Sequence, residues 1–289
     1  MKQILILLIS VILFSCSDSE IRYHIDETTS PTDTLTYLKS DMSLLNGIVY
    51  SEFGENGKYT NGKKDGIHKE WYEDGQIKSE ENFKLGSQYF DNYYSKIWWE
   101  NGQLLMEGKY IDGKEEGLCK VWDGNGQLIL ERIFIEGKEE GLCKSWYSNG
   151  KLKSEDNWKD DKEDGLCKKW YENGQLKSES NYKNGSLDGL YKIWYENGQL
   201  NWETSYTDGK QDGLNEKWYS NGQPQFKINY TDGKENGLRK SYDKNGVLKS
   251  TTNLKDGLIN GKFKYYVDGE LFFEMNYKND EQIGKTIYF

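Results

Sequence analysis

Residues 165–188 read GLCKKWYENGQLKSESNYKNGSLD, and this 24-residue unit decides the fold. Its opening glycine recurs every 24 residues, at Gly117, Gly141, Gly165, Gly189, Gly213, Gly237 and Gly261. Toward the N-terminus, Tyr93 takes the glycine position and Gly66 lies 27 residues before it. Self-similarity at such a period is typical of a repeat protein, in which each unit packs on its neighbours.

Each unit is predicted to form one β-hairpin. Two short β-prone runs, 165–170 and 176–182, flank the dipeptide Asn173-Gly174. Asn-Gly suits a two-residue turn in which both residues have positive φ, and it is the strongest local hairpin signal. A second Asn-Gly or Asp-Gly leads to the next unit. We therefore predict an all-β fold, an elongated single-layer antiparallel meander of about eighteen strands and roughly 85 Å.

Charge pairs within the units test this register. A two-residue turn places the fourth residue of a unit opposite the fifteenth, and this pair is Lys and Glu in six units: Lys69/Glu80, Lys96/Glu107, Lys120/Glu131, Lys144/Glu155, Lys168/Glu179 and Lys192/Glu203. In the seventh unit the charges are exchanged, to Glu216/Lys227. An exchange within one unit is what directly opposed charges allow, so the pairs are predicted to specify register, at ~0.2–1 kcal/mol each.

An aromatic residue stands at the sixth position of every unit: Trp71, Trp98, Trp122, Trp146, Trp170, Trp194, Trp218, Tyr242 and Tyr266. The register puts this row on the face of the ion pairs, and Cys167 and Tyr182 on the opposite face. Two interpretations stay open. The rows are cross-strand ladders that support a single-layer sheet, or they are a contact surface for a protein or for sugar rings.

The unit G-L-x-K-x-W-Y-x-N-G-Q-L-K-S-E-x-x-Y-x-x-G resembles the MORN-repeat variant family over residues 46–289. The resemblance implies a hairpin array that contacts proteins or lipids, and family members are often labelled antitoxins of a toxin–antitoxin pair. In some proteins such repeats sit beside a catalytic domain, which is absent from this sequence. Tyr93 in place of glycine, the longer connection after Phe83 and an irregular final copy depart from the pattern.

The N-terminus carries targeting features. An eleven-residue apolar run, 4–14, is too short to span a bilayer as a helix and suits a signal-peptide core. The following Ser15-Cys16 resembles the bacterial lipobox, which implies removal of residues 1–15 and lipidation of Cys16. The alternative is an ordinary secretory signal with an incidental cysteine. A lipid anchor predicts a location in the cell envelope, at the outer membrane or the cell surface.

Residues 16–45 are predicted to form a flexible tether, because they are rich in Ser, Thr and Asp and show no period. The acidic stretch 17–20 is either a surface-export signal or part of this tether. Overall, 38 Lys+Arg against 48 Asp+Glu give a net charge of −10. This charge excludes a general nucleic-acid binder and disfavours anionic lipid headgroups. The lack of alanine and the 22 Tyr and 10 Trp argue against a helical fold.

The sequence offers little for catalysis. It contains no nucleophile elbow, HExxH or P-loop, so we predict no enzyme activity and no cofactor. His68 occupies a variable strand position and is read as structural. Cys119, Cys143 and Cys167 fall two strand spacings apart, about 10 Å, too far for disulfides. They are predicted to be free thiols without a metal. The Asp-Gly turns could offer carboxylates to calcium, but hairpin turns need these residues anyway.

These features predict a lipid-anchored, non-enzymatic repeat scaffold that mediates protein–protein interaction in the cell envelope. Its predicted partner is another protein, with the membrane reached through the N-terminal lipid. The antitoxin label rests on resemblance alone, and immunity against an exported effector suits a lipidated protein better than neutralisation of a cytosolic toxin. The alternatives are a glycan- or cell-wall-binding module that uses the aromatic rows, and a passive envelope spacer.

Overall fold

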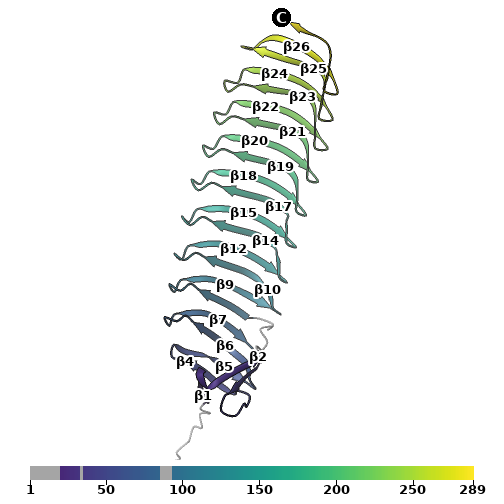
Figure 1. The fold of residues 1–289 in the computed structure, drawn as a ribbon. Coiled ribbons are helices and arrows are strands. Elements are labelled where there is room, and N and C mark those ends of the chain that lie inside the picture. Colours follow the sequence, from purple (N-terminus) through teal and green to yellow (C-terminus); the bar gives the residue numbers. More distant parts are fainter. Residues whose placement is uncertain (1–19, 33–34, 85–92) are drawn as a thin grey trace, which may run out of the picture.

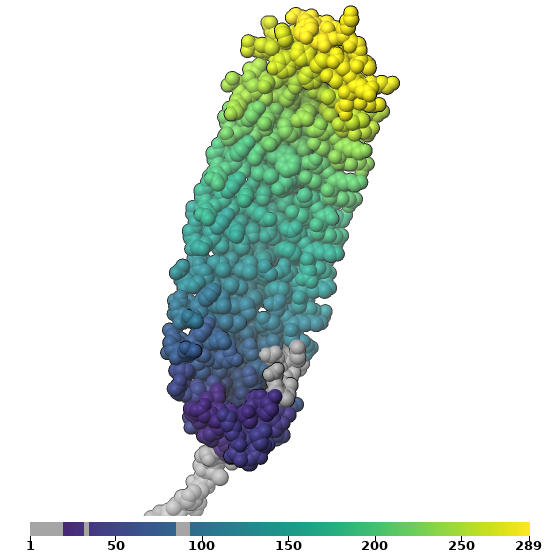
Figure 2. Space-filling view, in the orientation of Figure 1, coloured from purple at the N-terminus to yellow at the C-terminus, as the bar shows by residue number. Residues whose placement is uncertain are grey.

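The computed structural model describes residues 20–32, 35–84 and 93–289, so Cys16 and the expected signal peptide lie outside it. Hairpins stack one after another into a long rod (Figures 1 and 2). The rod is one open sheet of 25 strands, and β2 (Thr28–Thr32) and β3 (Leu35–Leu38) form a separate pair. No helix in the described ranges is long and apolar enough to cross a membrane. The all-β hairpin array is confirmed.

Each unit contributes an outgoing and a returning strand. The outgoing strands are β6 (Lys63–Trp71), β8 (Tyr93–Trp98), β11 (Gly117–Trp122), β14 (Gly141–Trp146), β17 (Gly165–Trp170), β19 (Ser186–Trp194), β21 (Lys210–Trp218), β23 (Lys234–Tyr242) and β25 (Leu258–Val267). The returning strands are β7 (Ile77–Phe83), β9 (Leu104–Ile111), β12 (Leu128–Ile135), β15 (Leu152–Lys159), β18 (Leu176–Lys183), β20 (Leu200–Thr207), β22 (Pro224–Thr231), β24 (Leu248–Lys255) and β26 (Glu270–Lys278). Three short strands, β10 (Lys114–Glu115), β13 (Lys138–Glu139) and β16 (Lys162–Glu163), precede a break in the outgoing strand, and β27 (Glu281–Tyr288) follows β26.

The two edges of the rod use different turns. Between hairpins, Asp208 and Gly209 have φ of 48° and 78° and join paired residues directly, which is the two-residue turn with two left-handed positions. Within a hairpin, Gly174 has φ of 92° while Asn173 stays right-handed, and the Gly174 amide donates to the Tyr171 carbonyl at 2.8 Å. This is a three-residue loop, a type I turn followed by a left-handed glycine. The prediction of a two-residue Asn-Gly turn is wrong at this edge.

The register nevertheless agrees with the charge pairs. A β-bulge between Lys169 and Trp170 offsets the longer loop, so Lys168 still faces Glu179, with Nζ and Oε2 3.2 Å apart. The Lys69–Glu80 pair, at 3.6 Å, and the exchanged Glu216–Lys227 pair are also formed.

The charge pairs also extend from one hairpin to the next. Glu179 faces Lys192 of the following unit, so Lys and Glu alternate along the rod. The exchange in the seventh unit breaks this alternation, because Glu203 now faces Glu216 and Lys227 faces Lys240.

The N-terminal segment is folded, which differs from the flexible tether expected over residues 16–45. Its described part forms β1 (Arg22–His24), the 3-10 turn η1 (Ile25–Glu27), β2 and β3. Strand β1 pairs in parallel with β4 (Gly47–Ser51), which begins the array with β5 (Gly54–Thr60). Leu45 is fully buried, and its amide donates to the Thr36 carbonyl at 3.0 Å. This end therefore has a small hydrophobic core.

Candidate functional site

Side chains at the Trp edge connect successive units. The Tyr171 hydroxyl donates to the Trp194 carbonyl at 2.8 Å, and Asn173 Nδ2 donates to the Glu196 carbonyl at 2.9 Å. The same tyrosine contact recurs as Tyr72–Trp98, Tyr147–Trp170 and Tyr195–Trp218. Each predicted Trp, from Trp71 to Trp218, ends an outgoing strand and is half-buried. The carbonyls of Trp98, Trp170, Trp194 and Trp218 are therefore fixed by a tyrosine of the preceding unit.

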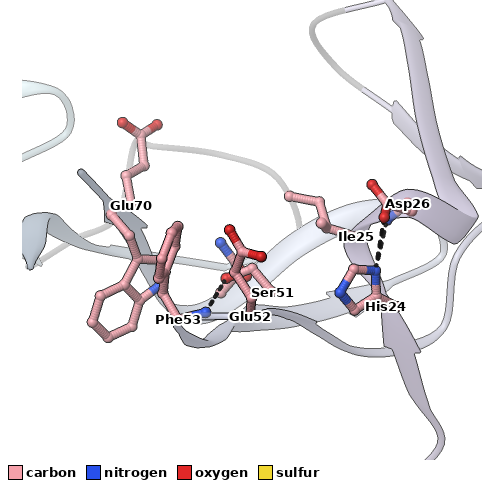
Figure 3. A pocket seen from close by; sticks show the side chains of 9 residues that line it. His24, Ile25, Asp26, Ser51, Glu52, Phe53 and Glu70 are labelled. Carbon is pink, nitrogen blue, oxygen red and sulfur yellow. Dashed lines mark hydrogen bonds and ion pairs between the residues drawn. The ribbon is translucent and has the colours of Figure 1, made fainter. Parts of the chain in front are cut away.

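A hollow of about 460 Å³ lies beside Trp71, where the N-terminal segment meets the first units. We call it hollow A, and it is lined by His24, Ile25, Asp26, Ser51, Glu52, Phe53, Asn56, Glu70 and Trp71. Figure 3 shows Glu52 and Phe53 between Glu70 on one side and Asp26 and His24 on the other. A Cβ on Gly54 would lie 3.1 Å from the Trp71 ring, so the glycine allows the loop to approach the indole.

A second hollow, of about 450 Å³, lies next along the same edge. We call it hollow B, and it is lined by Trp71, Tyr72, Glu73, Asp74, Lys78 and Glu100. Trp71 lines both hollows, and together they carry six carboxylates and one lysine. That lysine, Lys78, is 3.4 Å from Glu70. The surroundings of Trp71 are therefore strongly acidic.

A third hollow, of about 380 Å³, lies beside Trp170 and is called hollow C. Its charged lining is basic: Arg132, Lys153, Lys169 and Lys177 against Glu139 and Asp156. Trp170 lines it together with Cys143 and Tyr147. Trp170 reaches this hollow next to Tyr147, whose hydroxyl donates to the Trp170 carbonyl at 2.7 Å.

The repeat pattern of residues 64–85, 94–112, 139–160, 163–184, 187–210, 211–232 and 235–256 matches the model of the MORN repeat variant, over more than half of the chain. The chain belongs to the MORN repeat variant family. No curated protein matches the sequence. As a MORN repeat array, it has the form of a repeat scaffold, generally non-catalytic, for interaction with proteins or membranes.

The cysteines of this MORN array are free thiols on its more buried face, as predicted. Burial raises the pKa of Cys143 and of Cys167 to about 11, so both stay protonated at neutral pH. The structure adds a neighbour that sequence reasoning missed: Asp156 faces Cys143, and ligand atoms of Asp156, Glu163 and Cys167 lie within 4.8 Å of one another. The two carboxylates and one thiol are close enough to share a metal ion, but they are one ligand short of a closed tetrahedral zinc site.

His68 and the Asp-Gly turns have structural roles. His68 is buried, its Nε2 is 2.7 Å from the Lys58 carbonyl, and its ring packs edge-on against Tyr59 and Phe83. Burial lowers its pKa to about 4, which keeps the ring neutral. At the Asp232-Gly233 turn, Asp232 accepts from Lys210 Nζ at 3.4 Å. Neighbouring repeats thus use a carboxylate that was considered for calcium.

Sequence reasoning missed hollows A and B. Glu52 and Phe53 lie in the loop before β5, outside the periodic units, and reach Trp71 only because β4 and β5 pair with the array. The sequence did contain a signal, because acidic residues are dense around Trp71, at Glu70, Glu73 and Asp74. By contrast, two lysines directly precede Trp170.

Proposed function

We propose that this protein is a lipid-anchored, non-enzymatic scaffold for protein–protein interaction in the cell envelope. The supporting observation is the set of aromatic hollows along the Trp edge of the sheet. Partly exposed aromatic rings in rigid concave settings are typical anchors of protein interfaces. The Tyr and Asn hydrogen bonds connect the backbones of successive units, which makes the edge that carries the rings rigid before a partner arrives and limits the entropy lost on binding.

The proposed anchor places the N-terminal end of the rod near the membrane. If Cys16 is lipidated, only five residues, 17–21, separate it from β1. Five extended residues reach at most about 18 Å. Hollow A would then lie close to the bilayer, and the net charge of −10 would keep the rod from lying on an anionic surface.

An immunity-like role is the form of the antitoxin label that suits this location. A lipidated, exported protein meets effectors that arrive from outside the cell, whereas a cytosolic toxin is out of its reach. In this role the rod binds and neutralises an incoming protein without chemistry, consistent with the generally non-catalytic character of the family.

The test is chemical crosslinking in the cells that make the protein, followed by pull-down of the intact chain. We expect a single protein to be captured by the wild type and lost in the Cys16→Ala variant, which keeps the hollows but lacks the anchor. Failure to capture any protein with the wild type, under several crosslinkers, would contradict the proposal.

A glycan-binding module is the second candidate, because Phe53 is 37% exposed and lies beside carboxylates in hollow A. Rings and carboxylates in this arrangement also suit stacking and hydrogen bonding to a sugar. Quenching of tryptophan fluorescence by polysaccharide would favour this candidate, and no response across a broad glycan panel would remove it. A rod that binds neither protein nor glycan would be a passive spacer.

A further inference from the structure

We propose that hollows A and B together dock an arginine-rich segment of a partner protein, with guanidinium groups placed against Trp71 and Phe53. This inference rests on the proposed protein-binding function and names the chemistry of the partner. It commits to one occupant, a basic polypeptide, on charge complementarity and on the aromatic lining of the two hollows.

Charge is the first argument. The two hollows hold six carboxylates and one lysine. Glu70 is paired with Lys78, and Asp74 accepts from the Gln76 amide at 3.0 Å. Within the described ranges, the exposed Glu52, Glu73 and Glu100 have no hydrogen-bond or ion-pair partner. Three carboxylates near one indole therefore have no positive charge within the described part of the chain to pair with, so a cation from outside the chain can pair with them.

The aromatic lining is the second argument. Trp71 lines both hollows, and the partly exposed Phe53 ring lies in hollow A. A cation over an aromatic face gains from the ring quadrupole, and tryptophan is the best such platform. Arginine suits it better than lysine, because its planar guanidinium stacks on the ring and pairs with a carboxylate at the same time.

Hollow C shows that the acidity is local and not a property of the repeat. Trp170 occupies the same position in its unit as Trp71, yet the lining of hollow C carries four basic and two acidic side chains. A cationic segment that recognised only the aromatic row would meet repulsion there. The pairing of Trp71 with carboxylates from three separate loops is what selects a basic partner at this end of the rod.

Calorimetric titration of the full chain with an acetylated hexa-arginine amide tests the inference. The informative variant is Glu52→Gln/Glu73→Gln/Glu100→Gln, which removes three negative charges without removing any contact within the protein. The matched control is Glu172→Gln/Glu196→Gln/Glu281→Gln, which changes the net charge equally at exposed positions far along the rod. Near 0.15 M salt the Debye length is about 8 Å, so distant charges contribute little.

We expect the wild type to bind the peptide and the hollow variant to bind about tenfold more weakly, as the loss of three charge pairs implies. The control variant should stay within about twofold of the wild type. Equal weakening in both variants, absence of wild-type binding, or binding of a neutral oligosaccharide in place of the peptide would overturn the inference. If the anchored chain captures a protein in cells but does not bind hexa-arginine, this inference is wrong and the proposed function is still supported.

Discussion

Trp71 and Trp170 occupy the same position in their repeats, yet their surroundings differ. The loop of Glu52 and Phe53 reaches Trp71 from the N-terminal segment, and the hollows there are acidic. Trp170 has only neighbouring repeats around it, and its hollow is basic. The repeat thus sets where the aromatic stands, and the residues packed beside it set the chemistry of the hollow.

The two regions also differ in how they are stabilised. The N-terminal end has a small core around Leu45 and Val49, whereas the regular repeats bury few side chains and rely on strand pairing and on hydrogen bonds between units. Because a repeat array is stabilised by each unit and its neighbour contacts, the two regions can be destabilised separately.

The largest effect is expected for Leu45→Ala. Leu45 is fully buried, and truncating such a leucine costs about 2–5 kcal/mol. Limited proteolysis should then cut the variant between residues 20 and 62, while residues 117–256 stay protected. The matched control is Leu118→Ala, at a leucine that is 47% exposed in a regular repeat. Equal sensitivity of both variants would contradict a separate core at the N-terminal end.

A pH effect should follow at the same end. The pKa of His68 is lowered from 6.5 to about 4 by burial, and Lys64 also lowers it while Asp65 raises it. The unfolded chain binds a proton near pH 6.5 and the folded chain only near pH 4. Stability from this site is therefore complete above pH 6.5 and falls by about 3 kcal/mol as the pH drops to 4.

Hydrogen exchange at pH 7 and pH 5 measures this effect in the N-terminal end and in the regular repeats at once. The repeats from Gly117 onward contain no histidine and provide an internal control. His68→Gln should remove most of the difference at the N-terminal end. An unchanged pH dependence in that variant would show that other groups cause it.

A smaller effect is expected from the tyrosine contacts between repeats. Tyr195→Phe removes the hydrogen bond of 2.9 Å to the Trp218 carbonyl and should cost about 1 kcal/mol. The unfolding midpoint in denaturant measures this loss. Tyr94→Phe, at a side chain that is 66% exposed, should leave the midpoint unchanged. If both variants unfold at the same midpoint, the contacts do not stabilise the Trp edge.

The smallest effect is a gain. The double exchange Glu216→Lys/Lys227→Glu restores the alternation of charge, because Glu203 and Lys240 would each face an opposite charge. Each corrected pair should add about 0.2–1 kcal/mol, and high salt should remove the gain. Thermal unfolding at low and high salt measures it. A lower melting temperature at low salt would show that these positions do not interact across hairpins.

The repetition made most of the fold predictable. Pairs such as Lys168 and Glu179 indicated the register because oppositely charged residues recur at the same two positions in seven units. The turn at Asn173-Gly174 was misread because Asn-Gly also suits a type I turn with a left-handed glycine. The register is unchanged because a bulge beside Trp170 offsets the extra loop residue. No residue pattern in the sequence indicates this bulge.

The N-terminal end could not be predicted in the same way. Leu45 and Thr36 are buried by contacts that occur once and have no period. A polar, aperiodic segment is read as a tether unless its long-range contacts are known. The hollows around Trp71 depend on these contacts, so the sequence identified the Trp row and missed the acidic loops beside it.

Site-specific photocrosslinking in the cells that make the protein tests the central claim most directly. Benzoylphenylalanine would replace Phe53 in hollow A and, as a control, the exposed Glu172 of a regular repeat. We predict one protein adduct from position 53, dependent on Cys16, and none from position 172. Equal adducts at both positions, or none at either, would contradict a scaffold that binds its partner at the N-terminal end.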